Sequence, residues 1–150
     1  MATKADVDGF VAERTLALVG VSRSGKKFGN MVLKELSGKG YRILPVHRTA
    51  NEVDGHPAYP SLAALPEPVG GVIVVVPPAE AEQVVREASA QGVRRVWLQQ
   101  GASSPAAIQF CEEHGMSVVH GECILMFAEP AAFFHRAHRF VWKLVGRLPH

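Results

Sequence analysis

The sequence predicts an α/β fold in which one parallel sheet lies between two layers of helices. Short apolar segments of strand length alternate along the chain with longer segments whose apolar residues recur at helical spacing. The apolar segments are nearly continuous in character, as strands buried on both faces are. The first of them ends in a glycine-rich turn that leads directly into a helix, which is the pattern that begins a strand–helix–strand unit.

The segment that organises this prediction is the strand–turn–helix at residues 16–29. Residues 16–19 are four apolar residues that form the first strand, and residues 20–25 form a tight turn of small residues. Apolar residues then recur at helical spacing from Phe28 to Leu36. Such a turn presents unpaired backbone N–H groups at the positive end of a helix dipole, so it suits a phosphate ligand.

The other elements follow in alternating order along the chain. A leading helix within residues 1–14 precedes the first strand, and residues 47–55 form a polar loop. Ser104 and Pro105 are the N-cap and first residue of a helix that ends near His114. We expect the later strands at residues 41–46, 71–76, 93–98 and 116–120. We expect further helices at residues 79–90 and 130–147, with a short turn or helix at residues 59–65.

Together these elements predict a single domain, residues 1–150, with a Rossmann-like three-layer α/β/α sandwich and an extra C-terminal helix. We expect the five parallel strands in the order 3-2-1-4-5. The chain then reverses direction between strands one and four, and a crevice opens there beside Gly20, Gln100 and Gly101. Ligand contacts should gather at the carboxyl ends of the strands.

Composition limits the partners and the compartment. The formal net charge of +2 is too small to predict nucleic-acid binding. The N-terminus lacks a signal segment and no apolar run reaches membrane-spanning length, so we expect a cytoplasmic protein that does not enter a membrane. Cys111 and Cys123 fit a reduced protein better than a disulfide scaffold, and the spacing of cysteines and histidines predicts no metal site.

Residues 20–25 resemble three motifs and complete none of them. In the dinucleotide motif GxGxxG, Ser22 replaces the middle glycine. In the P-loop motif GxxxxGK[ST], Lys27 stands where a hydroxyl binds Mg²⁺, which disfavours a nucleoside triphosphatase. In the nucleophile elbow GxSxG, Ser24 replaces the last glycine, and no later acid–histidine pair supports a hydrolase. The dinucleotide interpretation therefore remains.

The end of the second strand tests which nucleotide this turn would bind. An NAD site has an acidic residue there for the ribose 2′-hydroxyl, whereas this chain has His47 and Arg48. A cationic pair favours a ribose that carries a phosphate, as in NADP and coenzyme A. The alternative is that Arg48 is a solvated loop charge.

Six segments, in order, resemble one known family. They read LALVGVSRS, GYRILPVHR, VDGHPAYPSL, VIVVVPP, VWLQQGA and VVHGECILM, and they extend from Leu16 to about Met126. The chain is identified by them as a member of the stand-alone CoA-binding domain family, which is similar to the CoA-binding domain of the succinyl-CoA synthetase alpha subunit. The resemblance implies binding of coenzyme A or an acyl-CoA, with NADP as the alternative.

The resemblance also implies a role for each strand end. The residues that would bind the pyrophosphate are Gly20, Val21, Ser22 and Arg23, with charge added by Lys26 or Arg48. The residues that would contact the ribose phosphate and base are Val46, His47 and Arg48. Val76, Pro77 and Pro78 would pack against adenine, and Gln100, Gly101 and Cys123 would border the thiol arm.

We expect a binding module rather than an enzyme, because no ligase or dehydrogenase catalytic residues are evident. Cys123 is either a thiol that meets the ligand sulfur or, as we favour, a structural cysteine, and Cys111 is a packing residue. Residues 130–147 form an amphipathic segment with one basic face. We expect it to pack across the sheet edge or on a second copy in a homodimer, rather than on a membrane. An interaction protein that works through this segment is the remaining alternative.

Overall fold

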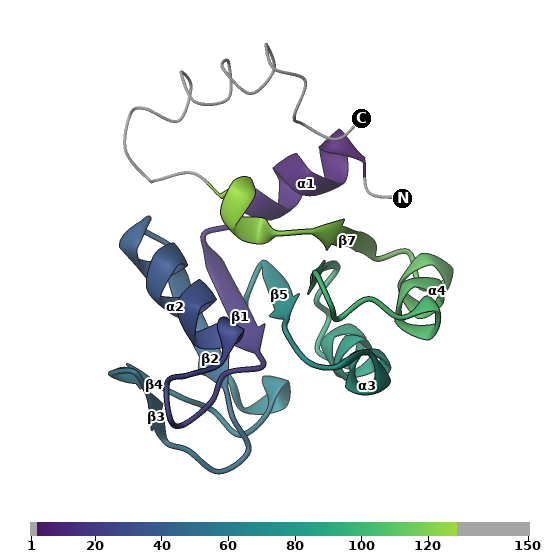
Figure 1. Ribbon diagram of the computed structural model, residues 1–150. Helices are drawn as coiled ribbons and strands as arrows, with labels where there is room; N and C mark the ends of the chain where they lie inside the picture. The colour runs from purple at the N-terminus through teal and green to yellow at the C-terminus, as the bar shows by residue number, and fades with distance from the viewer. Residues whose placement is uncertain (1–2, 129–150) are drawn as a thin grey trace.

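A five-stranded parallel sheet forms the centre of the fold (Figure 1). The computed structural model describes residues 3–128. The strands of the sheet are β1 (Thr15–Val19), β2 (Arg42–Val46), β5 (Gly71–Val74), β6 (Arg95–Gln99) and β7 (Ser117–Glu122). Every pairing between them is parallel, so the predicted α/β class with a parallel sheet is confirmed.

The order of the strands differs from the predicted 3-2-1-4-5. It is β2-β1-β5-β6-β7, which is 2-1-3-4-5 in chain order, because β5 pairs with β1 on the side opposite to β2. Pro45 gives the physical reason, since a proline cannot donate a ladder hydrogen bond and is confined to edge strands. On the outer edge of β2, Tyr59 N donates to Pro45 O at 3.0 Å and His47 N donates to Tyr59 O at 2.8 Å.

The observed order moves the point where the chain reverses direction. That point lies between β1 and β5, rather than between β1 and the fourth strand, β6. Val75, which follows β5, donates its N–H to Val19 O at 2.8 Å. The segment after β5 therefore lies beside Gly20, and the predicted neighbours Gln100 and Gly101 lie one strand further away.

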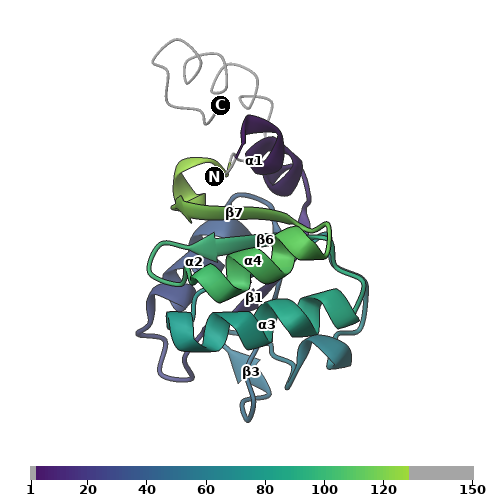
Figure 2. The same cartoon turned by 90° about the vertical axis from the view of Figure 1, so that its right-hand side faces the viewer.

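Helices cover both faces of the sheet, as the predicted three-layer sandwich requires (Figures 1 and 2). α1 (Lys4–Val11) and α2 (Phe28–Gly38) lie over one face, and α3 (Pro78–Ala90) and α4 (Pro105–Glu113) lie over the other. Successive residues of β1 alternate between the two layers, since Leu16 and Leu18 are buried with α1 and α2 whereas Ala17 is buried with α3.

Local capping signals set the helix ends that the sequence predicts. Thr3 and Asp6 form a reciprocal capping box at the start of α1, which confirms the leading helix. Ser104 Oγ accepts a hydrogen bond from Ala107 N at 3.0 Å, and Pro105 occupies the first position of α4. Both positions agree with the prediction.

The polar loop predicted at residues 47–55 contains most of a small hairpin. Its strands are β3 (Glu52–Val53) and β4 (His56–Pro57), which pair antiparallel. Asp54 and Gly55 form the turn with φ values of 50° and 82°, the left-handed conformation that two-residue hairpin turns require. From the sequence this segment is predicted only as a polar loop, although the Asp-Gly pair is a hairpin signal.

Two short 3-10 helices complete the described part of the chain. They are η1 (Leu62–Ala64), within the turn or helix predicted at residues 59–65, and η2 (Ile124–Met126), which follows β7. The C-terminal helix predicted at residues 130–147 lies outside the described residues. Within residues 3–128, no helix is long and apolar enough to cross a membrane.

Candidate functional site

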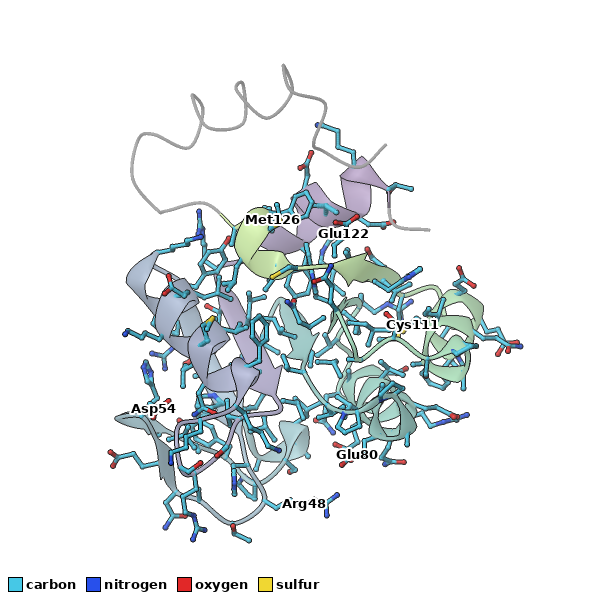
Figure 3. All side chains as sticks on the ribbon, viewed as in Figure 1. Arg48, Asp54, Glu80, Cys111, Glu122 and Met126 are labelled. Atoms are coloured by element: carbon cyan, nitrogen blue, oxygen red, sulfur yellow. The ribbon has the colours of Figure 1, made fainter. Side chains whose placement is uncertain are left out.

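A cleft of about 450 Å³ opens at the carboxyl ends of β1, β2 and β5. It includes six of the residues that the sequence predicts for ligand binding: Gly20, Val21, Val46, His47, Arg48 and Val76. Figure 3 labels two residues that line this cleft, Arg48 from the loop after β2 and Glu80 from α3. The glycine turn and the end of β2 meet in this cleft, but the crevice lies beside β5 rather than beside the predicted Gln100 and Gly101.

Eight predicted residues do not line the cleft: Ser22, Arg23, Lys26, Pro77, Pro78, Gln100, Gly101 and Cys123. The first three belong to the outer part of the glycine turn, and the two prolines begin α3 with exposed side chains. The last three follow β6 and β7, which β5 separates from β1. The strand order thus explains why these three lie apart from the glycine turn.

The structure adds residues to the cleft that sequence reasoning missed: Val19, Lys27, Pro60, Ser61, Ala79, Glu80, Gln83, Val84 and Glu87. Most belong to α3, because the strand that precedes this helix borders β1. Lys27 is a cleft residue, whereas Lys26, the lysine predicted to add charge, lines a neighbouring cleft between α2 and the hairpin.

Two glycines allow the turn to pass close to its neighbours. Gly20 has φ of +123°, and a Cβ there would overlap the carbonyl oxygen of Val75. A Cβ at Gly29 would overlap the carbonyl oxygen of Gly20. Gly29 therefore lets α2 pack against the end of β1, the role that the third glycine has in a dinucleotide motif. The expected motif glycine, Gly25, has an exposed position instead.

The glycine turn is held by one buried side chain, Asn30, which is 3% exposed. Asn30 Oδ1 accepts the Ser22 N–H at 2.8 Å, and Asn30 Nδ2 donates to Ser22 O at 2.9 Å and to Asp54 Oδ2 at 2.8 Å. The Ser22 N–H, which we expected to meet a phosphate, is thus satisfied within the protein. Val21 and Arg23 keep backbone N–H groups with no partner among residues 3–128.

The N-terminus of α2 meets the cleft at Lys27, its N-cap residue. No side chain caps this helix, and its first turn contains no acidic residue. The partial positive charge of the helix N-terminus is therefore not offset by a carboxylate of that turn. This end of the cleft favours an anion.

The loop after β2 adds a polar and cationic side to the same cleft. His47 Nδ1 accepts the backbone N–H groups of Thr49 at 3.1 Å and Ala50 at 3.0 Å. The neutral ring therefore carries its proton on Nε2. Arg48 is exposed and forms no ion pair within the described residues, so its guanidinium is available to an anionic ligand. Arg23 Nη2 donates to Thr49 Oγ1 at 2.8 Å, which links the glycine turn to this loop.

The two cysteines lie in different surroundings. Burial, helped by the nearby Glu112 carboxylate, raises the pKa of Cys111 to about 11, as expected for a packing residue. Cys123 is half-buried, and its Sγ accepts a hydrogen bond from Gln99 Nε2 at 3.0 Å. Gln99 is 1% exposed and also accepts the Ile124 N–H at 3.1 Å. The glutamine that holds Cys123 is therefore Gln99, whereas Gln100, which we expect to border the thiol arm, is exposed.

Comparison with known proteins identifies the family of this chain. Residues 14–129 match the family model described as a CoA binding domain. The alpha subunit of the ADP-forming acetate–CoA ligase II of Pyrococcus furiosus is 28% identical over 129 residues. That alignment covers 79% of this chain and 28% of the ligase subunit, so the chain spans little more than a quarter of that relative.

Two other relatives are close to this chain in size. YneT, an uncharacterized protein of Bacillus subtilis, is 31% identical over 111 residues, which are 74% of this chain and 82% of YneT. The structure of a conserved hypothetical protein of Pyrococcus furiosus is 39% identical with a TM-score of 0.72, covering 75% of this chain and 97% of that one. Since the family match includes the whole sheet, the glycine turn and the cleft, the chain belongs to the CoA binding domain family.

Proposed function

We propose that the domain binds coenzyme A, free or as an acyl thioester, in the cleft at the ends of β1, β2 and β5. The observation that carries the proposal is the uncapped N-terminus of α2 beside two cleft-lining cations, Lys27 and Arg48. Coenzyme A brings a pyrophosphate and a separate ribose phosphate. The helix N-terminus suits the first of these groups, and the arginine suits the second.

In this proposal the pyrophosphate lies against the backbone of the glycine turn. The N–H groups of Val21 and Arg23 and the N-terminus of α2 donate to it, while Lys27 supplies charge. The ribose phosphate lies toward the loop after β2, where Arg48 pairs with it and His47 Nε2–H donates a hydrogen bond. Ser22 contributes the shape of the turn, because its N–H is already bonded to Asn30.

The thiol arm then runs along the carboxyl edge of the sheet toward β7. Parallel strands lie about 4.8 Å apart, so the end of β7 is roughly 10 Å from the end of β5, within reach of an extended pantetheine. Gln100, Gly101 and Cys123 follow β6 and β7, and they are the residues we assign to this arm. Their absence from the nucleotide cleft fits that assignment.

The domain, as we propose it, holds the ligand without catalysing a reaction. The cleft-lining histidine, His47, uses Nδ1 to accept two backbone N–H groups, so that atom does not serve as a general base. The curated ligase relative is a much longer protein, and its name describes that protein's activity.

The test is calorimetric titration of the full chain with coenzyme A, acetyl-CoA, dephospho-CoA, NADP and NAD. We expect coenzyme A and acetyl-CoA to bind, and dephospho-CoA and NAD to bind more weakly. Tighter binding of NADP than of coenzyme A would overturn the proposal in favour of an NADP-binding protein. Binding of none of the five would leave an interaction protein as the function.

A further inference from the structure

The wall of the cleft opposite the cations is one stripe of α3. Glu80, Gln83, Val84 and Glu87 line the cleft, and their spacing of three, four and seven residues places them on one face of the helix. Val84 is buried, whereas the three polar side chains are exposed to the cleft. This polar stripe is not explained by phosphate binding, because two of its three members are acidic.

The polar side chains of the stripe have several oxygen atoms that are still open to accept hydrogen bonds from a ligand. Gln83 Nε2 donates to Glu87 Oε1 at 3.3 Å, which uses one donor of the amide and leaves Gln83 Oε1 open. Among the described residues, neither Glu80 nor Glu87 forms an ion pair. Ionised carboxylates accept hydrogen bonds and donate none. Most of the open hydrogen-bonding atoms of this wall are acceptors, so it favours a ligand group that donates hydrogen bonds.

The charges of the two walls also fix the direction of the ligand. α2 and α3 both begin at this end of the sheet, and neither has a side-chain cap. Glu80 lies in the first turn of α3, whereas the first turn of α2 contains no acidic residue and follows Lys27. A phosphate is attracted to the α2 wall and repelled by the α3 wall. The uncharged part of a nucleotide then faces α3.

We propose that the α3 wall recognises the exocyclic amino group of the purine base, and so makes the cleft selective for adenine over a purine that carries a keto group at the same position. This inference rests on the proposed function. The adenine amino group is a double donor that matches the acceptors of Glu80 and Gln83. Hypoxanthine presents a carbonyl oxygen there, which faces the Glu80 carboxylate as acceptor against acceptor, so that hydrogen bond is lost.

The floor between the two walls suits the flat face of such a base. Val46 and Val76 line the cleft there and are half-buried, and Pro60 lies at its margin. An apolar surface of this kind favours an aromatic ring but does not discriminate between purines. Selection among bases is therefore assigned to the α3 stripe.

The test compares coenzyme A with its deaminated analogue, in which hypoxanthine replaces adenine, by calorimetry on the full chain. We expect the wild-type protein to bind coenzyme A about five- to tenfold more tightly than the analogue, as one or two partly exposed hydrogen bonds allow. In the double variant Glu80→Ala, Gln83→Ala this ratio should fall to about one. The matched control is Glu82→Ala on the same helix, whose carboxylate pairs with Arg86 at 2.6 Å and does not line the cleft.

Different results would refute the base selectivity and the proposed function. Equal binding of both ligands to the wild-type protein would overturn the inference while leaving coenzyme A binding intact. An unchanged ratio in the double variant, or a ratio that falls equally in Glu82→Ala, would also overturn it. No binding of coenzyme A to the wild-type protein would refute the proposed function itself, and the base selectivity with it.

Discussion

Asn30 bonds both main-chain groups of Ser22, accepting its N–H at 2.8 Å and donating to its carbonyl oxygen at 2.9 Å. Ser22 lies at the centre of the glycine turn, and Asn30 lies in the first turn of α2. The pair fixes the turn relative to the helix before any ligand arrives, which lowers the entropic cost of binding. Asn30 also bonds Asp54, so the hairpin takes part in this arrangement.

Asn30→Ala is expected to weaken coenzyme A binding about tenfold and to destabilise the domain by about 1–3 kcal/mol, because it removes three hydrogen bonds at a buried position. Calorimetry and thermal unfolding measure the two effects. Asn51→Ala in the exposed loop before the hairpin is the control and should change neither quantity much. Unchanged affinity of Asn30→Ala for coenzyme A would show that the turn binds the ligand without the hydrogen bonds from Asn30.

Arg48→Ala should weaken coenzyme A more than dephospho-CoA. Arg48 is exposed in the cleft without an ion-pair partner among the described residues, and we assign it to the ribose phosphate. A charge-assisted hydrogen bond of this kind corresponds to a loss of roughly tenfold. The two ligands are titrated into wild-type and variant protein under the same salt. Equal losses for both ligands would remove Arg48 from this role.

Lys27 and Lys26 provide a matched pair for the pyrophosphate. Lys27 lines both the cleft at the ends of β1, β2 and β5 and the neighbouring cleft by the hairpin, whereas Lys26 lines only the second. We expect Lys27→Ala to weaken coenzyme A about three- to tenfold, and Lys26→Ala to have a smaller effect through the general field. Calorimetry at low and at moderate salt distinguishes a direct contact with the ligand from an effect of the general field, because salt screens the general field more strongly. A larger effect of Lys26→Ala would restore the assignment made from the sequence.

The two cysteines should differ in reactivity toward a thiol reagent. Burial raises the pKa of Cys111 to about 11, so its thiolate is scarce near neutral pH, whereas Cys123 is half-buried. Iodoacetamide followed by mass spectrometry should label Cys123 first in the native protein and both cysteines in denaturant. Acetyl-CoA, which has no free thiol, should slow the labelling of Cys123 if the thiol arm passes it. Unprotected Cys123 would contradict that path.

Asp6 should contribute to stability above about pH 4 and lose that contribution in acid. Burial disfavours the charged carboxylate, but hydrogen bonds from Ser117 Oγ at 2.7 Å and from Thr3 outweigh it and lower the pKa of Asp6. As the pH falls, Asp6 therefore takes up a proton in the unfolded chain at a higher pH than in the folded protein. The stabilisation fades as the pH falls below the ordinary pKa of an aspartate. Asp6→Asn should flatten the fall in Tm between about pH 4 and pH 2.

The control for this experiment is Glu52→Gln, a change at an exposed residue of β3. Its Tm should depend on pH as that of the wild-type protein does. A fall of Tm in Asp6→Asn as steep as that of the wild-type protein would show that Asp6 does not cause the loss of stability in acid.

The local part of the fold could be predicted from the sequence, because its causes are local. An apolar strand followed by Gly20 and a helical pattern predicts a strand–turn–helix unit, and Ser104 with Pro105 specifies a helix start. Strand order depends on which distant segments meet. Pro45 carried that signal, since a proline within a strand indicates an edge, and the predicted order did not use it.

The part of the site that neighbouring strand ends form could also be predicted from the sequence, whereas the part that depends on strand order could not. Gly20, Val21, His47 and Arg48 meet because the ends of neighbouring parallel strands share one edge of the sheet. The α3 wall could not be placed without knowing that β5 borders β1. Likewise, the choice between Lys26 and Lys27 depends on the direction in which the chain enters α2, which a run of adjacent lysines does not specify.

The most direct measurement is a titration of ¹⁵N-labelled full chain with coenzyme A, followed by backbone amide chemical shifts. We expect saturable shifts at Val21, Lys27 and Arg48, with smaller ones near Cys123. Residues around the separate cleft at Leu62–Val69 and Gln91–Val93, at the amino ends of the strands, should not move. Shifts confined to that second cleft, or no saturable shifts at millimolar coenzyme A, would contradict binding of coenzyme A at the carboxyl ends of the strands.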